Sequence, residues 1–158
     1  MKIYRDNGAI GALLDEYERA VNELQNTIAG LTEKELTTIM DLKTKDPDCR
    51  SIQTILTHVI RAGYYYTTEI RIHQGERIDI HSDKVFDNIE QYKIELNAMF
   101  RYSEQLFEDY PNIPLEEKEI KKKVLTRWGQ HYNVEQLFEH AIVHILRHRR
   151  QIERFLSA

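Results

Sequence analysis

The sequence contains a single cysteine, Cys49, among 158 residues. One cysteine cannot form a disulfide within the chain, and it cannot build a zinc ribbon or a cysteine-held cluster. Proline and glycine are also scarce, at three and six residues. No apolar run reaches the roughly 18 residues that a membrane-spanning helix requires. We therefore expect a protein without a disulfide framework and without a membrane segment, built from long uninterrupted elements.

Neither positive nor negative charge dominates the chain. Lys and Arg number 22 against 26 Asp and Glu, which gives a formal net charge of −4. Contacts to phosphates need clustered positive charge, so this balance predicts no nucleic-acid partner. The N-terminus lacks the apolar core of a signal peptide, and we expect a cytoplasmic location and no membrane partner. With cysteine nearly absent, the seven histidines are the candidate ligands for any metal.

Apolar residues recur at spacings of three and four along four long stretches, which is the signature of amphipathic helices. These stretches are residues 10–31, 52–70, 85–110 and 133–156. A capping box, Thr32 with Glu35, predicts a further short turn of helix between the first two. We therefore predict an all-α fold, a four-helix bundle, with residues 1–158 forming one domain. Connections of ten residues or more leave the helix order in space open.

The last helix carries polar residues where its core-facing seam should be apolar. The seam reads Val134, Leu137, Ala141, His144, His148, Gln151 and Phe155. Burying an unpaired polar group costs about 1–3 kcal/mol, so these positions need a partner. His144 and His148 lie one turn apart and point the same way, as a metal-binding pair does. The alternative is a pair of hydrogen-bonded or partly exposed histidines.

A third ligand would have to come from another helix. His58 lies near the edge of the apolar arc of the second long helix, where a side chain reaches inward while its site stays open. Three imidazoles and an open position match a catalytic metal site, whereas without partners His58 is a core-edge histidine. His140, one turn before His144, is either a supporting group or a solvated residue. The other three histidines, His73, His81 and His131, form no comparable pattern.

Three segments resemble the DinB-like (DinB/YfiT) family. Residues 133–151 resemble its closing motif, in which a histidine, three residues and a second histidine precede Arg-Gly-Gln. Residues 51–58 resemble part of the family's second helix, with His58 in the place of its ligand histidine. Thr126-Arg127-Trp128-Gly129 resembles the Trp-Gly stretch that commonly precedes the last helix. One departure is Arg150, which stands where the family usually has glycine.

The resemblance implies a four-helix bundle, often a homodimer, that binds a divalent metal, zinc or nickel, through three histidines. Carried over by position, the ligands are His58, His144 and His148. The activity implied is an S-transferase that joins a low-molecular-weight bacterial thiol to an electrophilic small molecule, or a related metal-dependent hydrolase. The alternative is a non-catalytic bundle in which the histidines bind metal structurally or hold no metal, and the protein serves as a binding or scaffold module.

A hydrolase would also need a group that transfers protons. By helical arithmetic the nearest candidates are Glu69 and Tyr65, which share a face with His58, although solvated or packing roles are the commoner alternative. Gln151, one turn beyond His148, is a candidate to orient that histidine. The run Tyr64-Tyr65-Tyr66 spreads around its helix, so at most one or two of its rings can line one pocket. Cys49 is expected to be incidental.

Overall fold

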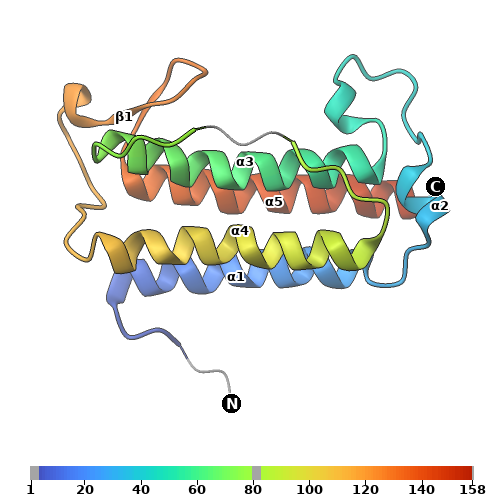
Figure 1. The fold of residues 1–158 in the computed structure, drawn as a ribbon, viewed down its shortest axis with the longest axis horizontal. Helices are drawn as coiled ribbons and strands as arrows, with labels where there is room; N and C mark the ends of the chain where they lie inside the picture. The colour runs from blue at the N-terminus through green and yellow to red at the C-terminus, as the bar shows by residue number, and fades with distance from the viewer. Residues whose placement is uncertain (1–3, 80–82, 158) are drawn as a thin grey trace.

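The computed structural model describes residues 4–79 and 83–157, and they form a helical bundle (Figure 1). The α-helices are α1 (Gly8–Ile28), α2 (Glu33–Thr37), α3 (Ile52–His73), α4 (Ile89–Asp109) and α5 (Val134–Leu156). Two 3-10 turns, η1 (Pro47–Cys49) and η2 (Ile120–Lys122), lie in the connections. Strands β1 (Val124–Leu125) and β2 (His131–Tyr132) pair in antiparallel register. The predicted all-α fold is confirmed.

Helices α2 to α5 begin at residues whose side chains accept from the first free backbone N–H groups, whereas Asn7 before α1 makes no such bond. Ser51 and Asn133 each form a capping box, with Thr54 and Gln136 respectively. The predicted stretch 85–110 was too long at its start, because the Asn88 side chain accepts from the backbone N–H of Gln91 and begins α4 there. Local capping chemistry therefore sets where α3, α4 and α5 start.

Each long helix packs against two others. α1 contacts α4 and α5, and α3 also contacts α4 and α5. The colour gradient in Figure 1 shows that α1 and α5 run in one direction, whereas α3 and α4 run in the opposite direction. The neighbours α3 and α4 are thus parallel, and the chain between them has to return along the bundle. Residues 83–88 lie along α3, where Arg61 pairs with Asp83 and Gln53 donates to the Phe86 carbonyl.

The core is apolar and tightly packed. Tyr17 of α1 meets Phe100 of α4 and Phe138 of α5 edge to face, at centroid distances of 5.7 and 6.1 Å. On α3, Gly63 leaves room for the Met99 side chain, since a Cβ there would lie 2.1 Å from the Met99 sulfur. In the described part of the chain, no helix combines the length and apolarity needed to cross a membrane.

Candidate metal centre

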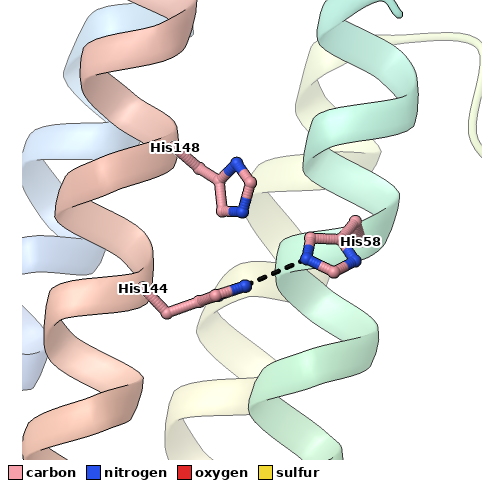
Figure 2. A group of neighbouring side chains, drawn as sticks. All are labelled: His58, His144 and His148. Atoms are coloured by element: carbon pink, nitrogen blue, oxygen red, sulfur yellow. Dashed lines mark hydrogen bonds between the residues drawn. The ribbon is translucent and has the colours of Figure 1, made fainter. Parts of the chain in front are cut away.

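The structure brings the three predicted histidines together between α3 and α5. Figure 2 shows His144 and His148, one turn apart on α5, facing His58 across the interface. One ring nitrogen from each lies within 4.8 Å of the other two. The Nε2 atoms of His58 and His144 are 3.0 Å apart. Such a cluster of three imidazoles can bind a metal ion.

Burial keeps these histidines uncharged. His144 and His148 are only 6% and 3% exposed, and His58 is partly buried. Loss of hydration lowers the pKa of all three, and the neighbouring imidazoles and Arg147 lower the pKa of His144 further. For His148 the pKa falls to about 4. The side chains are therefore neutral near pH 7, which is the protonation state that ligates a metal.

His148 is oriented by Gln151. The Nδ1 atom of His148 lies 3.1 Å from the Gln151 Oε1, an acceptor, so Nδ1 carries the proton and donates it. That tautomer leaves a lone pair on Nε2, and this atom is buried without a hydrogen-bond partner. A buried nitrogen without a partner is costly, and a divalent transition metal bound by the cluster would supply one. The donor set and this orphaned atom therefore fit a metal.

His58 is oriented by a carboxylate that sequence reasoning missed. The Oδ2 of Asp48 lies 3.1 Å from the Nδ1 of His58, and Arg61 donates to the same oxygen. A proton on Nδ1 then leaves Nε2 as the atom that faces His144. Asp48 belongs to the turn η1, and helical periodicity says nothing about where a loop carboxylate lies. Its closeness in sequence to the start of α3 was the only available signal.

Cys49, the neighbour of Asp48, also lies close to this centre. Its thiol contacts Asp46 Oδ2 at 3.5 Å and the side chain of Gln151. Burial raises the pKa of the thiol, so Cys49 stays protonated near neutral pH. The sequence alone gave no sign that Cys49 would contact Gln151, the residue that orients His148.

His140 lies beside the cluster within a group of aromatic rings. Its ring stacks on Trp128, with centroids 5.3 Å apart, and is 6.4 Å from the ring of His144. Tyr66 packs edge-on against both His140 and His144. His140 therefore lies next to His144 within an aromatic group, and its supporting role stays a prediction. Sequence analysis did not single out Tyr66 as a neighbour of the cluster.

The candidate proton-transfer groups lie further along α3. Glu69 is 11 residues beyond His58, which at 1.5 Å per residue is about 16 Å along the helix axis, and Tyr65 is about 10 Å along it. Glu69 accepts the backbone N–H of Arg127, and the guanidinium of Arg127 lies over the ring of Tyr65. The structure does not bring these two residues to the histidines, and their catalytic role stays a prediction.

The histidines that formed no pattern in the sequence, and Arg150, are not part of the cluster in the described residues. His73 Nε2 is within hydrogen-bonding distance of the Lys122 carbonyl, 2.9 Å away, and His131 lies in β2. His81 lies outside the described residues. Arg150 is exposed on α5.

The sequence of this chain matches the family model of the DinB family over residues 5–157. The match covers nearly the whole chain, and the protein belongs to the DinB family. A comparison with curated proteins gave no match.

Proposed function

We propose that the protein is a metal-dependent S-transferase that joins a low-molecular-weight thiol to an electrophilic small molecule. The observation that supports this proposal most is the orphaned Nε2 of the buried His148, which points to a metal as the missing partner of the cluster. His58, His144 and His148 would hold zinc or nickel. A divalent ion with three protein ligands keeps one position open, and it lowers the pKa of a thiol or water that binds there.

The residues around the cluster favour thiol transfer over hydrolysis. In the described residues, the group of close ligand atoms contains histidines alone and no carboxylate that could act as a base. Asp48 is already engaged by Arg61 and His58. Hydrolysis needs a positioned proton-transfer group, whereas a thiol that has lost its proton needs only to be oriented. The transfer forms a sulfur–carbon bond, breaks the bond to the leaving group, and releases the thiol proton with that group.

The chain would orient the reactants through two sets of contacts. Asp48 and Gln151 hold the tautomers of His58 and His148, so both Nε2 atoms face the centre. Tyr66 and the stacked pair His140–Trp128 form an aromatic wall beside His144, against which an apolar electrophile would pack. Trp128 is 41% exposed, so this wall is reachable from solvent.

The proposal is tested first by metal content and then by turnover. Untagged protein should contain one transition metal per chain, and His144→Ala should lose it while an exposed-histidine control, His131→Ala, keeps it. Metal-loaded protein should accelerate the reaction of a small thiol, such as cysteine or glutathione, with monochlorobimane.

The outcomes separate the alternatives. Absence of stoichiometric metal contradicts the proposal that the protein is a metal-dependent enzyme. Metal held by four protein ligands with no exchangeable position indicates a structural site in a scaffold. Thiol-independent cleavage of activated esters indicates a hydrolase. The predicted homodimer is tested separately by sedimentation.

A further inference from the structure

A cavity of ≈ 300 Å³ lies beside α3, outside the histidine cluster. Ile60 and Tyr64 of α3 line it, with Lys84 of the returning segment and Glu95 of α4. Arg127, in the turn between β1 and β2, also lines it. None of the three clustered histidines lines the cavity. Its volume is at the lower end of the range for small-molecule sites.

The cavity contains two carboxylates, and both are already neutralised. Asp83 is paired with Arg61 at 2.6 Å. Glu95 accepts from Lys84 at 3.0 Å and from the hydroxyl of Tyr64 at 2.9 Å. A cationic ligand would have to displace one of these partners. The acidic lining therefore does not select a positively charged ligand.

Arg127 is a lining cation whose guanidinium forms no close ion pair in the described part of the chain. The carboxylate of Glu69 attracts it electrostatically, but that carboxylate accepts the backbone N–H of Arg127, so the N–H groups of the guanidinium are not donated to it. The guanidinium carbon lies 3.0 Å from the centroid of the Tyr65 ring, so one face of the group is covered. A guanidinium stacked in this way presents its in-plane N–H groups at its edge, in the fork that matches a carboxylate.

Three of the other lining residues suit an apolar body, next to the hydroxyl-bearing Thr57 and Thr68. Ile60 and the rings of Tyr64 and Tyr65 offer aliphatic and aromatic surface next to the free edge of Arg127. Flat rings pack well against tyrosine faces and edges. We propose that this cavity is a binding site for a small carboxylate with a flat apolar body, held by Arg127 through the carboxylate and by Ile60, Tyr64 and Tyr65 through the body.

This site is distinct from the candidate metal centre, although Arg61 touches both. Arg61 lines the cavity with one side and donates to Asp48, the partner of His58, with the other. Nothing in the carboxylate site requires a metal. Its ligand should therefore bind equally well to metal-loaded and chelator-treated protein, and the two proposals fail or hold separately.

The test uses phenylacetate as the probe, with phenylacetamide and acetate as matched analogues. Trp128, the only tryptophan, follows Arg127 in the chain, so its fluorescence provides one readout, and ligand-observed NMR provides a second. Phenylacetate should bind in the millimolar range or tighter, and both analogues should bind more weakly. Replacing Arg127 by Gln should weaken binding about tenfold, as expected for losing a charge-assisted contact at an exposed site.

Two further variants locate the site. Lys84→Ala leaves the charge of Glu95 uncompensated and should also weaken phenylacetate binding. Arg101→Gln removes a positive charge from an exposed position on α4, away from the cavity, and should leave phenylacetate binding unchanged. The proposal is overturned by no binding in either readout, by equal affinity for phenylacetamide or acetate, or by unchanged affinity in Arg127→Gln.

Discussion

Acid should destabilise the metal-free protein well above the pH at which carboxylates titrate. His148 is 3% exposed, and burial lowers its pKa to about 4 in the folded state. In the unfolded chain its pKa returns to about 6.5. Below pH 6.5 the unfolded state therefore binds more protons than the folded state, and the free energy of unfolding falls. The loss continues until the pH reaches the folded-state value.

The size of the effect follows from the two pKa values. Between pH 7.5 and pH 5, the proton linkage of His148 alone removes about 2 kcal/mol of stability. The pKa of His144 is lowered in the same direction by the same burial, so it adds to the loss. A typical domain is stable by about 5–15 kcal/mol, so this change is easily measured.

The assay is urea denaturation of chelator-treated protein, followed by circular dichroism at both pH values. The matched variant is His148→Leu, which keeps the side chain large and removes the titrating group. Its unfolding free energy should fall less over the same pH interval, by about 2 kcal/mol. Equal pH dependence in the two proteins would refute the claim that burial holds His148 neutral.

Three further changes have definite expected outcomes. Bound metal should be retained to a lower pH than the pKa of free imidazole would allow, because burial already disfavours protonation of the three histidines. Equilibrium dialysis against a chelator over a pH series measures the retained metal. Loss of metal near pH 6.5 contradicts the prediction. Asp48→Asn and Gln151→Leu should each weaken metal affinity by about 10- to 100-fold in a competition titration, with unchanged helical content; unaltered affinity would show that neither group orients its histidine. Gly63→Ala should destabilise the fold by about 1–2 kcal/mol, because overpacking against Met99 outweighs the gain in helix propensity. Urea denaturation measures the change in stability. A more stable variant would show that the Met99 side chain moves away at little cost.

The parts of this protein that could be predicted from sequence are those set by local periodicity. The spacing of His144 and His148 on one seam follows directly from the helical repeat, as does the position of His58 at the edge of an apolar arc. The start of α5 at Asn133 was predictable because its capping box lies within four residues. The structure agrees with these predictions because each depends on neighbours in the chain.

What could not be predicted depends on contacts between distant segments. Asp48 reaches His58 from a loop, and Arg61 holds the carboxylate in place. The parallel course of α3 and α4 depends on a connection whose path no periodicity encodes. The tyrosine run shows both cases: the rings were expected to spread around the helix, yet only the structure shows that Tyr66 turns to His144 while Tyr64 and Tyr65 turn to the cavity.

The position of the histidines in the chain affects how the protein can fold. His58 and His144 are 86 residues apart, and α4 and the β1–β2 hairpin lie between them in sequence. Closing so long a loop is entropically costly, so the cluster forms only when α3 and α5 have already docked. A metal ion cannot nucleate this fold as it does a zinc finger, whose ligands are close in sequence. A metal ion bound at this cluster would instead stabilise α3 and α5 after they have docked, and it would slow their separation.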